Sequence, residues 1–214
     1  MLEATLVNTP RNVLAIGCHP DDIEIGCGGT ILSLTRSHPD LVITWVVLAA
    51  SGLRAEEAHM SASGFLAEAS STDIRLHEFR DGFLPYEGAA VKDVFESLKS
   101  VEPDLVLTHT RFDLHQDHRF ACELTWNTFR HHLILEYEIP KYDGDLGAPN
   151  VFVSLEEALV DEKVRLLHAH YASQSHKHWF DEELFRGLLR LRGMESATRY
   201  AEAFTCRKLS LLTG

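Results

Sequence analysis

The sequence predicts an α/β protein, a three-layer αβα sandwich built around a mostly parallel, Rossmann-like sheet. Three observations predict this class. Short apolar runs alternate with segments whose apolar residues have helical spacing. Several of those runs are apolar throughout, as in strands that are buried on both faces. The two patterns alternate as far as the fourth strand, which is typical of parallel strands joined by right-handed crossovers.

The elements follow in order along the chain. Apolar runs predict strands over residues 13–18, 42–50, 74–79, 105–109 and 151–153, and a last strand over residues 203–209. Helical spacing predicts helices over residues 30–37, 55–70, 91–100, 120–132 and 182–192. Ser154 with Glu157 forms a capping-box pattern, which predicts a further helix that runs to about residue 172. The glycine-rich stretch Gly26–Gly29 is expected to let a helix pack closely on a strand.

We expect a single domain over residues 1–214. Residues 1–135 would form the parallel core that carries the site, and residues 136–214 would cover the pocket and shape specificity. Residues 139–150, rich in Pro, Gly and Asp, are predicted to form a mobile loop.

Composition excludes some functions. A net charge of −12 argues against a nucleic-acid surface, which needs a basic patch. The longest apolar stretch, near residues 41–50, is far short of a membrane span. The first residues do not combine a basic and an apolar region as a signal peptide does, so we expect a cytoplasmic protein.

The cysteines agree with that expectation. No C-x-x-C pair occurs, which argues against a cysteine zinc site. The expected state is reduced, buried thiols at Cys18, Cys27, Cys122 and Cys206.

Polar clusters follow two of the predicted strands. His19, Asp21 and Asp22 come directly after the first strand. The stretch THTRFDLHQDHR (108–119) follows the fourth and supplies Asp113, His115, Asp117 and His118. Ligands of open α/β sheets bind beyond the carboxyl ends of the strands, where both clusters fall. The chain has no G-x-G-x-x-G motif, so a dinucleotide site is not indicated.

The residue types in these clusters suit a divalent metal. Two adjacent aspartates repel each other unless a cation or a shared proton offsets their charge. If the two loops converge, His19, Asp22 and His118 form a site with two histidines and one carboxylate. Three protein ligands leave a position for water, which is typical of a catalytic zinc.

Other interpretations stay open on the residues alone. Asp21 or Asp22 could cap a helix that begins near Gly26. Both could bind metal in a two-metal phosphoesterase. His19 and Asp21 with His118 match the triad of non-haem iron oxygenases, although the alternating α/β pattern opposes that fold. A non-catalytic, metal-bound sugar sensor is a further alternative, but it would need neither a base nor an acid.

The two motifs HPDD (19–22) and D-x-H-x-D-H (113–118) resemble those of the PIG-L/LmbE-like deacetylases. These are metal-dependent enzymes that remove N-acetyl groups from N-acetylglucosamine conjugates and related amino sugars. SGLRAEEA (51–58), RDGFL (80–84) and HYASQ (170–174) are similar to further stretches of the family. One departure is that Ile23 precedes Glu24, where many members have glutamate directly after HPDD.

The resemblance implies roles for individual residues. His19, Asp22 and His118 would bind Zn²⁺, although the same ligands suit Fe²⁺. Asp21 would be the general base, and Asp117 would orient an imidazole. His115 would stabilise the oxyanion and protonate the leaving amine, and we expect its acidic surroundings to keep it protonated.

Arg54 and Asp81 match substrate-contacting positions by the same resemblance. On the residues alone, Arg54 could equally form a salt bridge with Glu56 or Glu57, and Asp81 could be a turn residue before Gly82.

The sequence therefore predicts a zinc-dependent hydrolase that deacetylates an N-acetylglucosamine-type conjugate. It specifies neither the aglycone nor the oligomeric state, for which a homo-oligomer is one option. Hydrolysis of another small amide or ester at the same site is an alternative. A second histidine group is expected at an interface or pocket rim, and it comprises His168, His170, His176 and His178. Most aromatic residues that could stack on a sugar are expected to pack in the core; they are Tyr86, Trp126, Tyr142, Tyr171 and Trp179.

Overall fold

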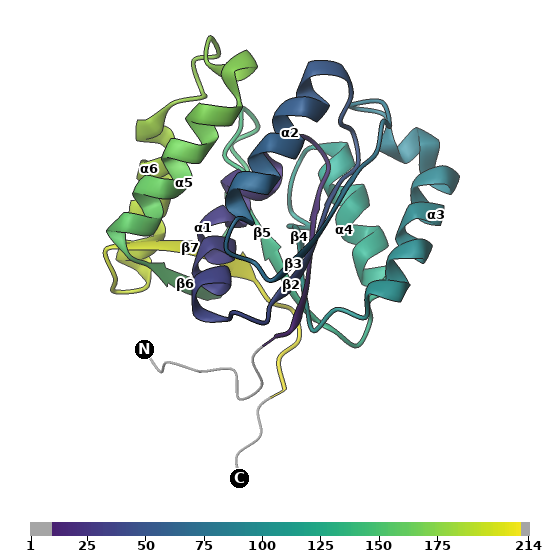
Figure 1. Ribbon diagram of the computed structural model, residues 1–214, viewed down its shortest axis with the longest axis horizontal. Helices are drawn as coiled ribbons and strands as arrows, with labels where there is room; N and C mark the ends of the chain where they lie inside the picture. The colour runs from purple at the N-terminus through teal and green to yellow at the C-terminus, as the bar shows by residue number, and fades with distance from the viewer. Residues whose placement is uncertain (1–9, 211–214) are drawn as a thin grey trace.

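Seven strands form one sheet in the computed structural model, which describes residues 10–210 (Figure 1). The strands are β1 (Asn12–Gly17), β2 (Val42–Val47), β3 (Ser71–Leu76), β4 (Leu105–His109), β5 (Leu133–Tyr137), β6 (Val151–Leu155) and β7 (Tyr200–Thr205). Their order across the sheet is β3-β2-β1-β4-β5-β7-β6. The first five in chain order are parallel, and β7 runs antiparallel to both of its neighbours. The predicted αβα class with a mostly parallel sheet is confirmed.

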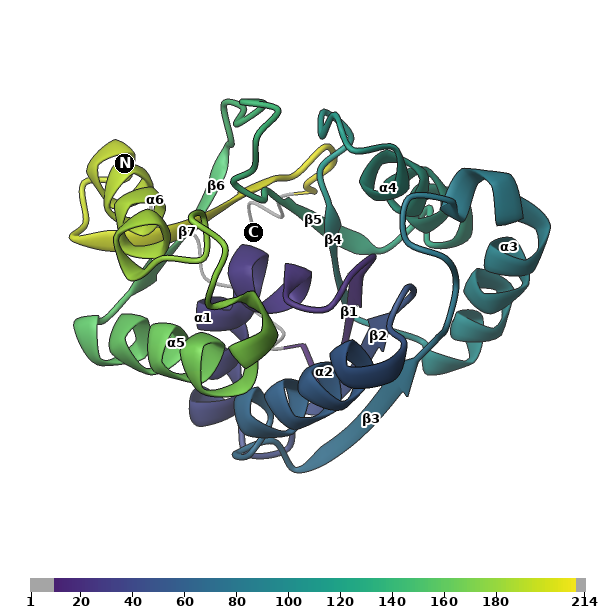
Figure 2. The same cartoon turned by 90° about the horizontal axis from the view of Figure 1, so that it is seen from above.

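Helices cover both faces of this sheet. The α-helices are α1 (Asp22–Ser37), α2 (Gly52–Phe65), α3 (Gly88–Ser97), α4 (Gln116–Thr128), α5 (Glu157–His170) and α6 (Glu182–Glu195). Short 3₁₀ turns lie at η1 (Leu84–Glu87), η2 (Leu98–Val101) and η3 (Ala172–Gln174). Seen from above, α1, α2 and α5 lie on one side of the sheet and α3 and α4 on the other (Figure 2). No helix within residues 10–210 is both long and apolar enough to cross a membrane.

The central strands are apolar throughout because each face has its own core. In β1, Val13 and Ala15 belong to the cluster beneath α1 and α2, whereas Leu14 and Ile16 belong to the cluster beneath α3 and α4. Burial on both faces removes the polar-apolar alternation that a half-exposed strand would show. The uninterrupted apolar runs therefore marked the strands of the parallel core, because these strands are buried on both faces.

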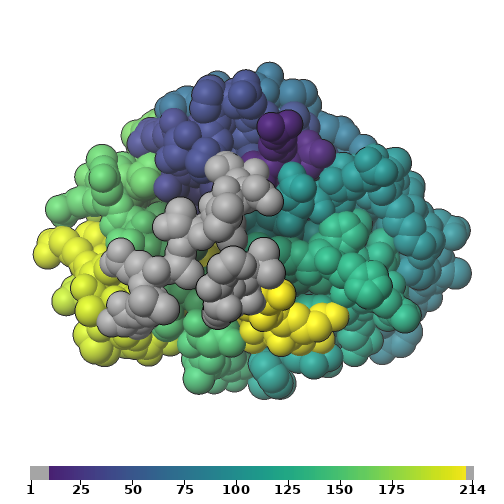
Figure 3. Space-filling view, turned by 90° about the horizontal axis from the view of Figure 1, so that it is seen from below, coloured from purple at the N-terminus to yellow at the C-terminus, as the bar shows by residue number. Residues whose placement is uncertain are grey.

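The chain reverses its direction of winding between β1 and β4, which are neighbours in the sheet. The loops that leave their carboxyl ends meet at this switch point, on the face seen in Figure 2. The first described residues and the segment after β7 lie on the opposite face (Figure 3). The switch point is thus where the two polar clusters come together.

Helix α1 begins at Asp22, several residues earlier than predicted, because packing overrides the poor helix propensity of its glycines. A Cβ at Gly26 would lie 2.2 Å from the Tyr137 ring, and one at Gly28 would lie 2.6 Å from Phe65. Gly26 and Gly29 therefore pack closely on strands, as expected, whereas Gly28 packs on Phe65 of helix α2.

Two other expectations were wrong. The helix predicted over residues 120–132 ends in the structure at Thr128. Residues 133–137, which were not predicted to be a strand, form β5. Ser154 does not start a capping box, because it lies inside β6 and α5 begins after Glu156 without a side-chain cap.

The C-terminal part does more than cover one end of the sheet. Strands β6 and β7 extend its edge, and α5 packs on α1 and α2. A buried ion pair fastens this part to α1. Lys163 and Glu202 lie 2.7 Å apart, Lys163 donates to the Ile25 carbonyl, and Glu202 accepts the backbone N–H groups of Gly29 and Thr30.

Candidate active site

A pocket of about 340 Å³ opens at the carboxyl ends of the parallel strands. Its lining includes His19, Asp21 and Asp22, from the β1–α1 connection and the start of α1, and His115 and His118, from the β4–α4 connection and the first turn of α4. Five of the six predicted metal-binding and catalytic residues therefore line one cavity, although 96 positions separate His19 from His115 in the sequence.

The three predicted metal ligands converge on one point. His19 Nδ1 lies 3.1 Å from His118 Nε2, and these nitrogens lie 3.4 and 3.5 Å from Asp22 Oδ2. Ligand atoms at about 2.0–2.1 Å from a tetrahedral zinc are separated by about 3.4 Å. The triangle thus has the size and the donor atoms that a divalent metal requires.

Each histidine of the triangle has a carboxylate on its far nitrogen. His118 Nδ1 lies 2.9 Å from Asp113 Oδ2, and His19 Nε2 lies 3.2 Å from Asp117 Oδ2. In a neutral ring such contacts fix the tautomer, because the far nitrogen donates a hydrogen bond to the carboxylate and the near nitrogen keeps its lone pair. Burial and the neighbouring His109 lower the pKa of His118 to about 4, so its ring is neutral near pH 7.

His19 lies among three carboxylates. Burial alone would lower its pKa, but hydrogen bonds to Asp117, Asp22 and Asp81 outweigh burial and raise the pKa well above the ordinary value. These carboxylates therefore favour a positive charge at this position, which an imidazolium or a bound metal would supply.

The Asp22 carboxylate is held by the chain that precedes it. Its Oδ2 accepts the backbone N–H groups of His19 at 2.7 Å and Cys18 at 3.0 Å. Although burial opposes ionisation, the neighbouring His118 and His109 keep the pKa of Asp22 well below its usual value. Asp22 is thus an ionised, oriented carboxylate, as a metal ligand must be, and it begins α1 instead of capping it.

Asp21 occupies the N-cap position of α1, yet its side chain makes no cap hydrogen bond. Its φ of 90° lies in the left-handed region, which is costly for a residue other than glycine and is often found at functional sites. Burial raises the pKa of Asp21 to about 6. Its Oδ2 accepts from Arg54 Nη2 at 2.9 Å, and among residues 10–210 it belongs to no metal-sized donor cluster.

Arg54 pairs with protein groups in this structure. It donates to Asp21, to the Pro20 carbonyl at 2.5 Å and to Glu57 at 3.3 Å. The salt bridge with Glu57 was one of the two alternatives that the sequence left open; the contact with Asp21 was not foreseen. Because Arg54 also lines the pocket, contact with a substrate stays a prediction.

His115 caps helix α4. Its Nδ1 accepts the backbone N–H of Asp117 at 3.3 Å, which leaves Nε2 as the protonated nitrogen of a neutral ring. The expectation of a protonated His115 was wrong for this structure. Burial and the charge of nearby His19 lower its pKa, and they outweigh the surrounding carboxylates.

Asp117 and Asp81 both reach the edge of His19. The fully buried Asp117 accepts backbone N–H groups from Gly82 at 2.7 Å and Leu84 at 3.1 Å, which hold the carboxylate against His19 Nε2. Gly82 has a φ of 77°, which suits glycine in the turn that presents these donors. Asp81 lies on the pocket rim with a side chain that is 77% exposed, and its Oδ1 is 3.1 Å from His19 Nε2.

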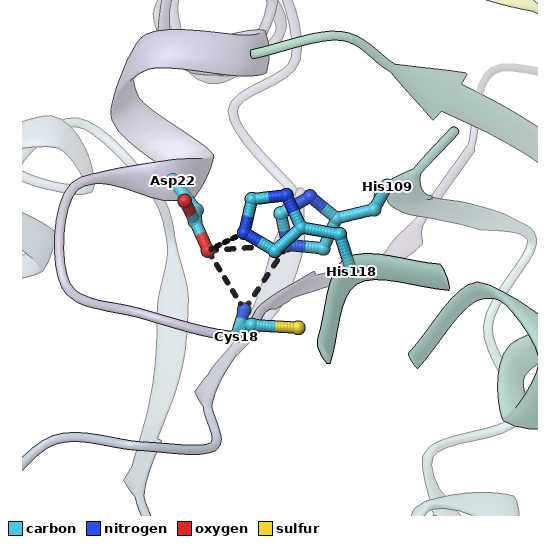
Figure 4. A group of neighbouring side chains, drawn as sticks. All are labelled: Cys18, Asp22, His109 and His118. Atoms are coloured by element: carbon cyan, nitrogen blue, oxygen red, sulfur yellow. Dashed lines mark hydrogen bonds and ion pairs between the residues drawn. The ribbon is translucent and has the colours of Figure 1, made fainter. Parts of the chain in front are cut away.

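His109 was missed by the sequence analysis because it ends a buried strand and resembles a core residue. Its ring stacks on His118 with centroids 3.9 Å apart, and its Nε2 accepts the Cys18 backbone N–H at 3.1 Å (Figure 4). Asp113 was noted but given no role. The D-x-H-x-D-H spacing was the signal that could have assigned it as the partner of His118.

Cys18 lies in a second potential donor cluster with Asp22, His109 and His118. Figure 4 shows that the contacts of Cys18 run from its backbone nitrogen and not from sulfur. Burial and nearby carboxylates raise the pKa of its thiol, which disfavours the thiolate that binds metals. This cluster shares two members with the triangle and is the buried side of the same site.

The second histidine group, Glu24 and the aromatic residues named from the sequence differ in their surroundings. Within the described chain no metal-sized cluster includes any of His168, His170, His176 or His178. Glu24 is buried and accepts the Tyr171 hydroxyl at 2.5 Å, and burial raises its pKa to about 7. Of the aromatic candidates, Tyr142 and Trp179 line the pocket.

Two proteins that are named as deacetylases are similar to this chain in sequence or in structure. Diacetylchitobiose deacetylase of Thermococcus kodakarensis is 28% identical over 222 residues, which cover 91% of this chain and 82% of that protein. The structure of N,N'-diacetylchitobiose deacetylase from Pyrococcus horikoshii has a TM-score of 0.74 at 22% identity and covers 92% of this chain and 84% of that one.

The same fold also carries other chemistry. GalB, the 4-carboxy-2-hydroxymuconate hydratase of Pseudomonas putida KT2440, has a TM-score of 0.75 at 14% identity and covers 94% of this chain and 98% of that one. Fold likeness alone therefore assigns no reaction. Residues 14–129, more than half of the chain, match the family described as PIG-L: GlcNAc-PI de-N-acetylase, and the chain belongs to that family.

Proposed function

We propose that this protein is a metal-dependent hydrolase that removes the N-acetyl group from an N-acetylglucosamine-type amino sugar conjugate. The products would be acetate and a free amine. The observation that carries the proposal is the triangle of His19 Nδ1, Asp22 Oδ2 and His118 Nε2 with a separate buried carboxylate, Asp21, beside it in one pocket. The family and the deacetylase activity in the name of the Thermococcus relative support the same reaction.

The triangle fits a divalent metal by donor type and spacing, and we propose Zn²⁺ or Fe²⁺. Such an ion would polarise the amide carbonyl and lower the pKa of a water molecule. Asp113 and Asp117 would orient the two histidine ligands through their far nitrogens.

Asp21 would accept a proton from the attacking water. A base must be ionised near neutral pH and must stand free of the metal, and Arg54 favours the ionised form of Asp21. Arg54 would also fix the direction of this carboxylate, since it holds both Asp21 Oδ2 and the Pro20 carbonyl. The proton taken by Asp21 would return to the nitrogen as the C–N bond breaks.

His115 would stabilise the tetrahedral intermediate. In the neutral tautomer its Nε2–H can donate a hydrogen bond to the developing oxyanion. Delivery of a proton to the amine would require the imidazolium, which the lowered pKa of His115 disfavours in this structure. Hydrogen bonding is therefore the role that we favour.

The substrate would occupy the rest of the pocket. Asp81 at the rim could accept hydrogen bonds from sugar hydroxyls, and Tyr142 and Trp179 offer faces on which a sugar ring can stack. The four free, buried cysteines support a reducing, cytoplasmic location, and the net charge of −12 argues against a nucleic-acid partner. Sedimentation would test whether the protein forms a homo-oligomer.

The test combines metal analysis with acetate release from a panel of N-acetylglucosamine conjugates. We expect about one metal per chain and release of acetate by the wild-type protein but not by Asp21→Asn. Bound metal with hydrolysis of a different amide or ester would change the substrate. Bound metal without hydrolysis would favour a sugar sensor, two metals a phosphoesterase, and no metal after reconstitution would overturn the proposal.

A further inference from the structure

Lys141 lies in the loop between β5 and β6 and lines the pocket. Its Nζ lies 2.9 Å from Asp113 Oδ2 and 2.6 Å from Asp145 Oδ2, and its side chain is 13% exposed. The loop that the sequence predicted to be mobile is therefore anchored by a largely buried ammonium group. Arg192 anchors it again through the Gly147 carbonyl.

One oxygen of Asp113 joins this loop to a predicted metal ligand. Asp113 Oδ2 contacts both Lys141 Nζ and His118 Nδ1, each at 2.9 Å. Its other oxygen accepts the backbone N–H of His115 at 2.8 Å. The buried Asp113 carboxylate is thus held from several sides, and Lys141 is its contact from outside the β4–α4 segment.

We propose that Lys141 is a positioning residue for the metal site, acting through Asp113 on the ring of His118. The inference rests on the metal site of the proposed function and adds a residue that neither the HPDD nor the D-x-H-x-D-H motif contains. Ile139, Pro140 and Tyr142, the neighbours of Lys141, line the pocket. The pocket wall and a metal ligand are therefore fastened to the same ammonium group.

The direction in which metal affinity changes distinguishes a positioning role of Lys141 from a purely electrostatic effect. A cation near the site repels a bound metal ion, so the loss of its charge alone would tighten metal binding. If Lys141 positions Asp113, the same loss leaves the carboxylate free to rotate away from His118 and weakens metal binding. The direction of the change in affinity decides between the two.

The experiment measures the affinity of the metal-free protein for Zn²⁺ by competition with a chromogenic chelator. We expect Lys141→Met to weaken binding about 10- to 100-fold, as is usual for residues that orient metal ligands. Lys141→Arg should stay close to wild type because it keeps the charge and its donors. The matched control is Lys177→Met, which removes another pocket-lining lysine that pairs with no carboxylate within residues 10–210.

A double-mutant cycle tests whether Lys141 acts through Asp113. In an Asp113→Asn background, Lys141→Met should have little further effect on affinity. Unchanged or tighter binding by Lys141→Met, or fully additive effects in the cycle, would overturn the inference. Thermal unfolding of the metal-free variants checks the fold, and Lys141→Gln replaces Lys141→Met if that variant does not fold. A wild-type protein that binds neither Zn²⁺ nor Fe²⁺ would instead refute the proposed function.

Discussion

His19 Nδ1 and His118 Nε2 lie 3.1 Å apart, and each ring has a carboxylate at its other nitrogen. Two imidazole nitrogens face each other at this distance only with a proton or a metal ion between them. Asp22 Oδ2 completes the triangle from the start of α1. The arrangement makes metal binding the first property to test.

His118→Ala removes one ligand of the triangle, and we expect it to lower metal affinity by more than about 100-fold, a larger loss than an orienting residue gives. Metal content after dialysis against a fixed free-metal concentration measures this. His59→Ala, at an exposed histidine of α2, is the control and should keep the wild-type content. Wild-type affinity in His118→Ala would move the metal to a different set of ligands.

Asp21→Asn should separate binding from chemistry. The amide keeps the size of the side chain but cannot accept a proton, so the rate of acetate release should fall by roughly 10²–10⁴. Metal content should stay at the wild-type level because Asp21 pairs with Arg54 and not with the triangle. A variant that loses metal together with activity would make Asp21 a ligand, as in the two-metal alternative.

Arg54→Met tests whether Arg54 serves the base or the substrate. If it orients and ionises Asp21, kcat should fall about tenfold while KM changes little. Loss of the cation should also raise the pKa of Asp21 further, since Arg54 is one of the groups that lower it. Asp21 is active when ionised, so activity is lost as pH falls through its pKa, and the acidic limb of kcat/KM should move to higher pH.

Arg54→Lys should restore part of the rate, because it keeps the charge but not the planar donor pair. Arg36→Met is the control at an arginine that pairs with Glu68 and Glu162 away from the pocket. A rise in KM with unchanged kcat and pH profile would assign Arg54 to the substrate.

The sequence predicted the parts of the site that local spacing encodes. HPDD and D-x-H-x-D-H each occupy a few consecutive positions at strand ends, and the α/β pattern brings those ends together. His109 and Lys141 could not be predicted in this way. His109 is a buried strand residue whose contact with His118 depends on side-chain packing, and Lys141 reaches Asp113 from a loop 28 positions away.

Strand β5 was missed for a related reason. It carries Glu136, a charged residue that a propensity argument excludes from a buried strand. The structure satisfies this carboxylate with Trp126, with Arg207 and with the backbone N–H of Arg111. Partners that lie far apart in sequence can therefore override local propensity, and only the folded chain reveals them.

The cysteines provide a test of burial. All four thiols are free, and burial raises the pKa values of Cys18, Cys27, Cys122 and Cys206. A thiol reacts with disulfide reagents as the thiolate, so the native protein should react slowly at pH 8 and all four thiols should react after denaturation. Rapid reaction of the native protein would show that these sites open readily.

The buried pair Lys163–Glu202 should contribute more to stability than an exposed ion pair. Lys163→Met leaves Glu202 buried without its cation, so we expect the free energy of unfolding in urea to fall by about 3–5 kcal/mol. Arg186→Met, which breaks exposed pairs with Asp161 and Glu182, should cost only about 0–1 kcal/mol.

The double variant Lys163→Met/Glu202→Gln should recover part of the loss, because a neutral amide costs less to bury than an unpaired carboxylate. Full recovery is not expected, since Glu202 also accepts two backbone N–H groups of α1, which carries the predicted ligand Asp22. Metal affinity should therefore fall in Lys163→Met as α1 loosens. A loss of stability equal to that of Arg186→Met would show that water reaches this pair.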